Sequence, residues 1–339
     1  MARTRAGTAR RASITDVARL AGVSAGTVSN VLNHPSQVSD RTRTKVLDAI
    51  EQLSFVRNAS ARQLREGTSR TVGAIVLDIA NPFFTATARG IEDRLAQDDL
   101  VLMLASSDED PERESRFVRQ FVEHGVRGLL VTPSRGTLET VARVRERGTD
   151  VVLLDHTSPF PDVASVAVDD VRGAALATAH LLERGHERIA FLNGPLSLRQ
   201  CADRRQGVLA AVVEAGLDPG RVVVEVTLPS LNADSGSRAM AELLARPGPP
   251  PTATFCVNDF TALGAMRHLR EASIAVPEQM AVVGYDDVDF APELAVPLTS
   301  VRQPSHEIGW RAADLLLGDG EPEQVLFQPA LVVRASSGA

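Results

Sequence analysis

The stretch SITDVARLAGVSAGTVSNVLN, residues 13–33, decides how the N-terminal part of the chain folds. It begins with Ser13, and Asp16 follows three residues later, which is the pattern of a capping box at the start of a helix. Val17 and Leu20 then recur at helical spacing. This part of the stretch therefore predicts one short helix with an apolar side.

A second helix is predicted directly after the first. Gly22 permits the left-handed turn that ends a helix, and Ser24 is a good N-cap for the next one. Val28, Val31 and Leu32 form the apolar side of that helix. Two short helices joined by a glycine turn make a helix-turn-helix, in which the second helix lies in the major groove of DNA.

The alternative interpretation of this stretch is a small helical hairpin inside a larger fold. Two features favour a DNA-binding unit instead. The motif lies in a basic segment, and a third helix is predicted at residues 39–55, where Val46, Ile50 and Leu53 share one face. Three such helices can enclose a small core.

Charge is distributed unevenly along the 339 residues, whose net charge is −7. Residues 1–70 hold 12 basic and 5 acidic residues, whereas the remainder holds 24 basic and 38 acidic residues. A basic N-terminal part on an acidic body is typical of a phosphate-binding module joined to a sensor domain. A run of solvated charge would explain the acidic body better than it explains the basic N-terminal part.

Other features of the composition indicate an intracellular protein. The chain has two cysteines, Cys201 and Cys256, which do not suggest a disulfide framework. No apolar run approaches the roughly 20 residues that a transmembrane helix needs. Residues 1–12 are polar and arginine-rich with no apolar run behind them, so we expect a disordered basic arm and not a secretory signal. These observations predict a cytoplasmic protein that is not bound to a membrane.

Beyond the third helix the pattern changes twice. In residues 58–70 the one large apolar side chain is Leu64, so this segment is expected to be a linker that folds only against DNA and a partner copy. From residue 71 onward, apolar runs alternate with amphipathic segments, which predicts parallel sheet with helices on both faces, in two domains. The strand-like runs are TVGAIVLD, VLMLASS, GLLVTP, DVVLLD, SVAVDD, RIAFLNGP, RVVVEV, TATFCVND, MAVVGYDD and LTSVRQP.

Polar and aromatic residues follow these predicted strands at the points where the strands end. In parallel sheets, ligands bind beyond the carboxyl ends of the strands. Carboxylates, amides and an arginine suit hydrogen bonds to neighbouring hydroxyls, and aromatic rings suit the apolar face of a sugar or base. The sequence therefore predicts a cleft for a polar small molecule. The positions are Asp78, Asn81, Phe83, Phe84, Asp155, residues 193–204, Asn258, Asp259, Asp286 and Asp287.

Taken together, these features resemble the LacI/GalR family of bacterial transcriptional regulators. The resemblance spans about residues 13–334, and the order and spacing of its motifs are specific. The motifs are TDVARLAGVSAGTVSNVLN, VSDRTRTKV, NASARQLR, NPFF, GHERIAFLNGP, RRQG, NDFTALGAMR, VVGYDD and LTSVRQP.

The resemblance implies an α/β fold class with an N-terminal all-α helix-turn-helix domain and a periplasmic-binding-protein-like core of two subdomains, joined by three crossovers. The implied division is an arm at 1–12, the DNA-binding domain at 13–57, a hinge helix or linker at 58–70 and an effector-binding and dimerisation core at 71–339. Within that core, the N-subdomain takes about 71–167 plus about 302–325, and the C-subdomain takes about 168–299 plus about 326–339.

The resemblance also implies which residues contact DNA. Ala25, Gly26 and Asn30 occupy the base-reading positions, where many members have larger polar residues early and arginine at the place of Asn30. Asparagine can bond adenine bidentately where arginine would favour guanine. Leu64 matches the hinge leucine that inserts into the minor groove, with linker filler as the alternative. The implied contacts to the DNA backbone, which position the protein without specifying sequence, are Ser24, Thr27, Ser29, Asn33 and Thr42.

In the core, the implied effector-binding residues are Phe83, Phe84, Asp155, Arg204, Asn258 and Asp286. The alternative for the two phenylalanines is ordinary helix packing, and for Arg204 it is a structural ion pair. Asp287 is expected to be a cap or a solvent-exposed group, and Asp259 could equally cap the helix that follows it.

We therefore expect a ligand-responsive repressor of a sugar or related metabolic operon, which binds a palindromic double-stranded operator as a homodimer and needs no cofactor or metal. The alternative is a non-repressor with the same sugar-binding core, such as an activator or a co-repressor-dependent regulator that responds to a nucleoside or purine. An enzyme is disfavoured because the sequence lacks G-x-S-x-G, H-E-x-x-H, a P-loop and a G-x-G-x-x-G after a strand. A secreted sugar-binding protein would need a signal or lipoprotein cysteine, and a nucleoid-type structural protein would lack the cleft.

Overall fold

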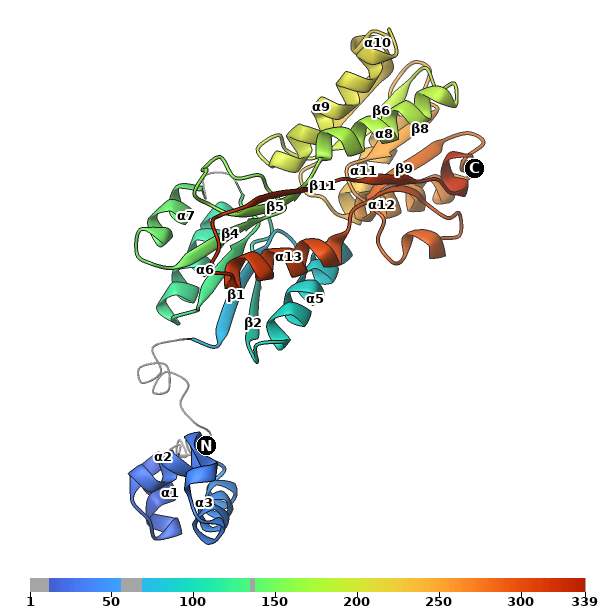
Figure 1. Cartoon of the computed structure of the whole chain (residues 1–339). Coiled ribbons are helices and arrows are strands. Elements are labelled where there is room, and N and C mark those ends of the chain that lie inside the picture. Colours follow the sequence, from blue (N-terminus) through green and yellow to red (C-terminus); the bar gives the residue numbers. More distant parts are fainter. Residues whose placement is uncertain (1–11, 56–68, 135–137, 339) are drawn as a thin grey trace, which may run out of the picture. The chain divides into compact units, whose positions relative to one another are not determined.

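The computed structural model describes residues 12–55, 69–134 and 138–338 and divides the chain into two compact units, residues 1–68 and 69–339 (Figure 1). Most of the predicted hinge segment, including Leu64, and residues 1–11 of the predicted arm lie outside the described residues.

The first unit contains the predicted helix-turn-helix and a third helix. Its helices are α1 (Ile14–Ala21), α2 (Ala25–Asn33), a 3-10 turn η1 (Pro35–Gln37) and α3 (Asp40–Gln52). The capping box at Ser13 is present, and Gly22 ends α1 with a φ of 66°. Val17, Val28 and Val46 meet in the core between the three helices. Leu20, which the spacing places on the apolar side of α1, is instead 49% exposed, because three residues fall short of a full helical turn and Val17 takes the position that faces the core.

The second unit is built on two six-stranded sheets. The first sheet has the order β11-β5-β4-β3-β1-β2, and all its pairs are parallel. Its strands are β1 (Thr71–Val76), β2 (Val101–Ser106), β3 (Gly128–Val131), β4 (Asp150–Leu154), β5 (Ser165–Val168) and β11 (Gln324–Phe327).

The second sheet has the order β12-β10-β9-β8-β6-β7. Its strands are β6 (Ile189–Asn193), β7 (Val223–Thr227), β8 (Ala253–Cys256), β9 (Ala281–Asp286), β10 (Thr299–Arg302) and β12 (Ala330–Val332). The sheet is parallel except for β12, which runs antiparallel to β10 at the edge. The predicted strand-like runs account for ten of these twelve strands, and the short edge strands β11 and β12 are additions from the structure.

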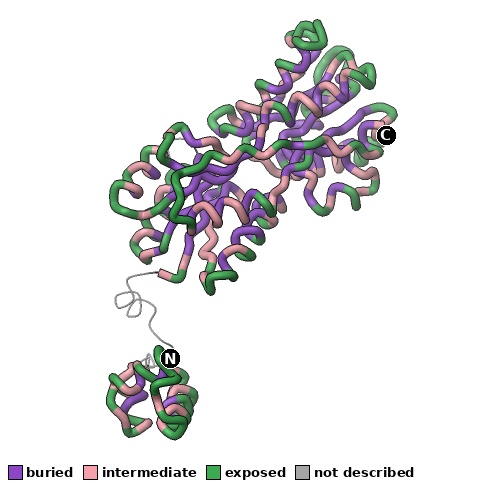
Figure 2. The backbone as a smooth tube through the Cα atoms, in the orientation of Figure 1, coloured by how far each residue is buried: buried purple, intermediate pink, exposed green. Residues whose placement is uncertain are grey.

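Alternate strand residues face opposite helix layers, as period-two geometry requires. Val72 and Ala74 of β1 pack with α5 and α13, whereas Ile75 packs with α6 and α7 on the other face. In the second sheet, α8 and α9 cover one face, and α11 and α12 cover the other. The buried strands run between exposed helix surfaces in both halves (Figure 2). The helices are α5 (Pro82–Ala96), α6 (Pro111–Glu123), α7 (Leu138–Arg145), α8 (Asp170–Glu183), α9 (Arg199–Glu214), α10 (Pro219–Val222), α11 (Ala233–Leu244), α12 (Asp259–Glu271) and α13 (Ser305–Leu317), with 3-10 turns η2 (Ala291–Glu293) and η3 (Ala335–Ser337).

The chain passes between the two sheets three times. It leaves the first sheet after β5, returns after β10 through α13, and passes to the second sheet again between β11 and β12. β11 continues the first sheet to Phe327, a little beyond the boundary expected near residue 325. Helix α13 lies directly against α5, where a side chain on Gly90 or Gly309 would overlap backbone carbonyl oxygens of the facing helix.

Candidate functional site

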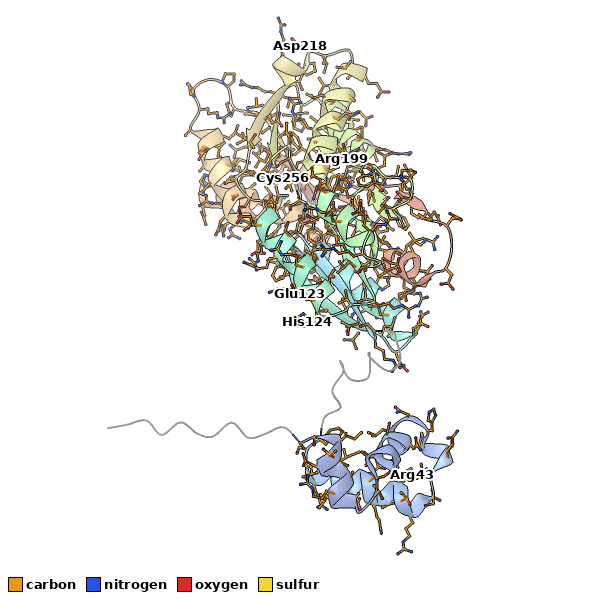
Figure 3. All side chains as sticks on the ribbon, turned by 90° about the vertical axis from the view of Figure 1, so that its left-hand side faces the viewer. Arg43, Glu123, His124, Arg199, Asp218 and Cys256 are labelled. Atoms are coloured by element: carbon orange, nitrogen blue, oxygen red, sulfur yellow. The ribbon has the colours of Figure 1, made fainter. Side chains whose placement is uncertain are left out.

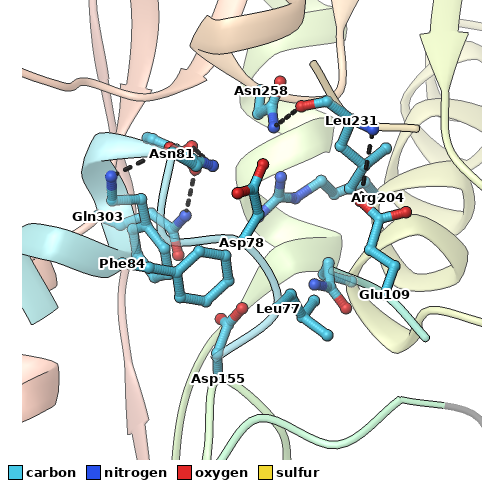
Figure 4. Close-up of a pocket in the computed structure, with 13 residues that line it drawn as sticks. Leu77, Asp78, Asn81, Phe84, Glu109, Asp155, Arg204, Leu231, Asn258 and Gln303 are labelled. Atoms are coloured by element: carbon cyan, nitrogen blue, oxygen red, sulfur yellow. Dashed lines mark hydrogen bonds between the residues drawn. The ribbon is translucent and has the colours of Figure 1, made fainter. Parts of the chain in front are cut away.

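All six predicted effector-binding residues lie in the wall of one cleft in the second unit. The wall is formed by segments at the carboxyl ends of β1, β2 and β4 of the first sheet and of β7, β8, β9 and β10 of the second, together with α9 (Figure 4). The carboxyl ends of both sheets therefore meet at this cleft, as parallel topology predicts. The role of these residues in binding stays a prediction.

The aromatic side of the cleft is held by the start of α5. Asn81 caps this helix, and its Oδ1 accepts a hydrogen bond from the backbone N–H of Phe83 over 3.0 Å. Phe83 and Phe84 meet edge to face, with ring centroids 5.0 Å apart, and both are buried. Both rings also belong to the main core cluster, so they pack the helix and line the cleft at the same time.

Two aspartates at strand ends have backbone conformations with positive φ, which are strained for residues other than glycine. Asp155 follows β4 with a φ of 53°, and Asp286 ends β9 with a φ of 112°. Residues other than glycine in this region are costly and cluster at functional sites. Burial raises the pKa of Asp155 well above its ordinary value, and the negative charge of Asp170 raises it further. Burial also raises the pKa of Asp286, to about 6, although Arg204 lowers it.

Arg204 lies on α9, lines the same cleft and is 3% exposed. Its Nε donates to Asp170 Oδ1 over 2.8 Å, and its Nη1 donates to the backbone carbonyl of Val257. The guanidinium carbon lies 3.6 Å from the ring centroid of Tyr285. Arg204 is therefore a structural ion-pair partner that also lines the cleft, which combines the two alternatives set out from the sequence.

Amide side chains complete the wall on the side of the second sheet. Gln303, just after β10, donates from Nε2 to Asp286 Oδ1 over 2.7 Å. Asn258 caps α12 by accepting from the Thr261 N–H over 2.7 Å, and it donates to the carbonyl of Leu231 over 3.1 Å.

Two hydrogen bonds join the halves of the cleft. Asn81 Nδ2 donates to Asp286 Oδ2, and the backbone N–H of Leu231 donates to Glu109 Oε1, each over 3.4 Å. Burial raises the pKa of Glu109, although the bond from Leu231 lowers it. Both bonds are long, so each contributes little to holding the two halves together.

Several lining residues were missed as site residues by the sequence reasoning. Asp78 and Asn81 were noted at the end of β1 but not assigned a role, and Gln200 lies in the segment noted after β6. Glu109 and Gln303 carried no assignment, although each follows a predicted strand and the strand-end rule applied to β2 and β10 could have found them.

Two aspartates differ from their expected roles. Asp287 is neither a cap nor exposed: its carboxylate is 4% exposed and pairs with Arg302 over 2.7 Å and with Arg334 over 2.6 Å. Asp259 does not cap α12, since Asn258 does so. Its buried carboxylate instead accepts from the hydroxyl of Ser300 over 2.6 Å, because folding brings β10 beside the start of that helix.

The candidate DNA-binding surface is the exposed side of α2. Ser24 caps the helix by accepting from the Thr27 N–H over 3.0 Å. Gly26 and Asn30 are exposed on the side opposite the buried valines, whereas Ala25 is half-buried and packs against the core of the unit. Ser29 and Asn33 lie on the same side and are joined by a hydrogen bond of 3.2 Å. Thr42 lies at the start of α3, where Ser39 caps that helix.

The remaining chemistry-bearing groups do not form a second site in the part of the chain that the structure describes. Cys201 and Cys256 are free and buried, and both belong to the second unit. Arg43 lies on α3 of the first unit (Figure 3). The described histidine, cysteine and acidic side chains include no group of three placed to hold a metal ion. None of the described helices combines the length and apolar composition needed to span a bilayer.

Comparison with known proteins matches a family model to each of the two units. Residues 13–58 match bacterial regulatory proteins of the lacI family, and residues 178–337 match a periplasmic binding protein-like domain. The HTH-type transcriptional repressor PurR of Aliivibrio fischeri (strain ATCC 700601 / ES114) is 33% identical over 335 residues, covering 96% of this chain and 98% of the relative. The HTH-type transcriptional regulator GalR of Escherichia coli (strain K12) is 35% identical over 330 residues, covering 96% and 95%.

Solved structures agree with these matches. The lac repressor dimer bound to operator and the anti-inducer ONPF has a TM-score of 0.81 at 28% identity, covering 97% of this chain and 100% of that chain. The transcriptional regulator CelR in complex with cellobiose has a TM-score of 0.70 at 32% identity, covering 96% and 100%. The chain therefore belongs to the LacI family of bacterial transcriptional regulators, and it is a ligand-responsive DNA-binding regulator and not an enzyme.

Proposed function

We propose that the protein represses transcription from a palindromic operator as a homodimer in the cytoplasm, and that a small sugar-like effector in the cleft controls its affinity for DNA. The observation that carries the proposal is the cleft wall, which combines buried aromatic rings with carboxylates, amides and one arginine from both sheets. Such a wall stacks against the apolar face of a sugar and bonds its hydroxyls. CelR, which resembles this chain, was solved with cellobiose.

The effector acts by stabilising one arrangement of the two halves of the core over another. In the described structure, the halves are joined across the cleft by the two long hydrogen bonds at Asp286 and Glu109. An effector that contacts both halves replaces these bonds with its own, so it stabilises one spacing of the halves over another. The change in DNA affinity that the effector causes cannot exceed the difference in its affinity for the two arrangements, and by linkage DNA changes effector affinity by the same factor.

Dimerisation follows from the form of the DNA site. A single helix-turn-helix reads a short half-site, and two copies related by a twofold axis read a palindrome. Repression is preferred to activation because relatives that match nearly the whole chain carry the name of repressor. The predicted contacts of Leu64 with the minor groove and of residues 58–70 with a partner copy belong to the same proposal.

The test begins with selection of bound sequences from randomised DNA, using the full-length protein. The selected sites should be palindromic, and sedimentation should give a dimer with and without this DNA. Thermal-shift screening of the same protein against sugars, nucleosides and sugar phosphates then finds compounds that raise the melting temperature in proportion to ln(1 + [L]/Kd). A compound that binds the cleft should change operator affinity. A stable monomer that binds one half-site with full affinity would contradict the proposal.

A further inference from the structure

The cleft wall carries an excess of negative charge. Arg204 is the one basic side chain among its described lining residues, and it is already bonded to Asp170 just behind the wall. The acidic lining residues are Asp78, Glu109, Asp155 and Asp286. An anionic ligand would therefore meet several carboxylates and a guanidinium whose charge is largely committed.

Two buried oxygen atoms of the wall have no hydrogen-bond partner among the described residues. These are Oδ1 of Asp155 and Oε1 of Gln303, on side chains that belong to residues 5% and 4% exposed. A buried acceptor without a donor costs free energy, and native proteins rarely leave a buried polar atom without a hydrogen-bond partner unless there is a reason. Both acceptors line the cleft, so a ligand that brings hydrogen-bond donors satisfies them.

The carboxylate of Asp155 points into the cleft beside the ring of Phe84 (Figure 4). A carboxylate and an aromatic face together favour a cation, since the first supplies charge and the second supplies the negative face of its π system. Burial and the neighbouring charge of Asp170 raise the pKa of Asp155 although Arg204 lowers it, so the surrounding residues do not fully compensate its ionised form. A positive charge on the ligand would supply that compensation.

We infer that the effector carries a protonated amine that lies against Asp155, as an amino sugar or a similar cationic polyol does. This inference deepens the proposed function and rests on it. The hydroxyls of such a ligand donate to Gln303 and the remaining carboxylates, and the ammonium group occupies the acidic side of the cleft. Sugar phosphates and sugar acids are excluded by the same carboxylates.

The test is a panel in which each sugar appears in three forms, neutral, amine and phosphate: glucose, glucosamine and glucose 6-phosphate, with the same three forms of galactose and mannose. Isothermal titration with the full-length protein at pH 7.5 should show that an amine binds at least tenfold more tightly than its neutral parent, and that no phosphate binds. Asp155→Asn should weaken binding of the amine and bring that ratio near one. The matched control is Asp150→Asn, which alters an exposed aspartate at the other end of β4 and should keep the ratio.

Failure of this inference is distinguishable from failure of the proposed function. If a neutral or phosphorylated compound binds most tightly and alters operator affinity, the effector site stands and the amine inference is wrong. The amine inference is equally wrong if Asp155→Asn folds, binds the amine and retains the tenfold preference. If no compound of any charge binds the protein or changes its affinity for DNA, both the amine inference and the sugar-like effector are contradicted.

Discussion

Arg204 and Asp170 form a buried ion pair, 2.8 Å from Nε to Oδ1, that joins α9 to the start of α8 directly behind the cleft wall. Their side chains are 4% and 7% exposed. In such a place, removing one partner leaves a charge that neither water nor another ion compensates. The pair therefore links the stability of the second unit to the position of a cleft residue.

Replacing Arg204 with alanine should destabilise the second unit by about 3–5 kcal/mol, because Asp170 stays buried without its partner. The double variant Arg204→Met with Asp170→Asn should recover most of that loss, since it removes both charges at similar volume. Urea unfolding of the full-length proteins measures both changes. Equal stability of the single and double variants would contradict a structural role for the pair.

The same double variant separates folding from effector response. It should bind the selected operator with wild-type affinity, because the reading helix belongs to the other unit, and it should lose the response to an effector that shifts the wild type. Losing a charged hydrogen bond to a buried ligand costs about 2–5 kcal/mol. Unchanged effector affinity in this variant would place the effector site elsewhere.

Asp286 should make stability fall as the pH rises. Burial raises its pKa to about 6 in the folded protein, with Asn81, Gln303, Arg204 and Asp170 as its neighbours. The folded state then holds more protons than the unfolded state between pH 4 and 6, so the free energy of unfolding decreases as this carboxyl ionises. From pH 4.5 to 7.5 the contribution amounts to roughly 2 kcal/mol.

Urea unfolding of Asp286→Asn at those two pH values checks this prediction. Between pH 4.5 and 7.5, the free energy of unfolding of the variant should decrease by about 2 kcal/mol less than that of the wild type. Asp150→Asn, on an exposed position of β4, should follow the wild-type pH dependence. If the free energy of unfolding changes by the same amount in the wild type and in the variant over this range, Asp286 is not the titrating group.

The parts of the fold that the sequence predicts are those with local signals. Ser13, Gly22 and Ser24 act through residues within one turn of a helix, and the strands of the core are continuous apolar runs bounded by polar residues. The polar ends of those runs also locate the cleft, since parallel strands bring their carboxyl ends together. That is why Asp155 and Asp286, which are far apart along the chain, could both be assigned to one site.

The residues that were misjudged depend on contacts between distant segments. Asp287 looks like an ordinary exposed aspartate in VVGYDD, and the pairing of β10 with β9 and β12 brings Arg302 and Arg334 beside it. Gln303 becomes part of the cleft because β10 pairs with β9. The strands β11 and β12 are short and carry few residues of a periodic pattern, so their existence depends on the sheet edges that they complete.

Operator binding should be steeply dependent on salt, because the basic N-terminal part must neutralise DNA phosphates. Lys45 is exposed on α3, and Arg43 on the same helix is paired with Asp40 over 2.8 Å. If Lys45 contacts a phosphate, Lys45→Ala should reduce the slope of log K against log salt by about 0.9. The control is Arg221→Ala, which removes an exposed charge from the second unit and should leave the slope unchanged.

Fluorescence anisotropy with the selected operator at several salt concentrations gives these slopes. Deleting residues 2–11 should weaken specific binding less than Lys45→Ala or Arg43→Ala does, since we expect that arm to contribute only general attraction to phosphates. Loss of specific binding on deletion of the arm would show that the DNA-binding domain begins earlier than residue 13.

Asn30 should carry most of the direct base recognition in each half-site. It is exposed on α2, whereas Gly26 offers only backbone surface and Ala25 only a half-buried methyl group. The asparagine amide pairs best with N6 and N7 of adenine, and it reaches less far than a guanidinium. Asn30→Ala should therefore remove the preference at one or two symmetric positions by about 1–3 kcal/mol and leave the others unchanged. Asn30→Arg should shift the same positions toward guanine.

Selection from randomised operators with the wild type and both variants tests this prediction. Enrichment of the same bases by all three proteins would move specificity away from Asn30, to the shape of the operator and the predicted Leu64 contact.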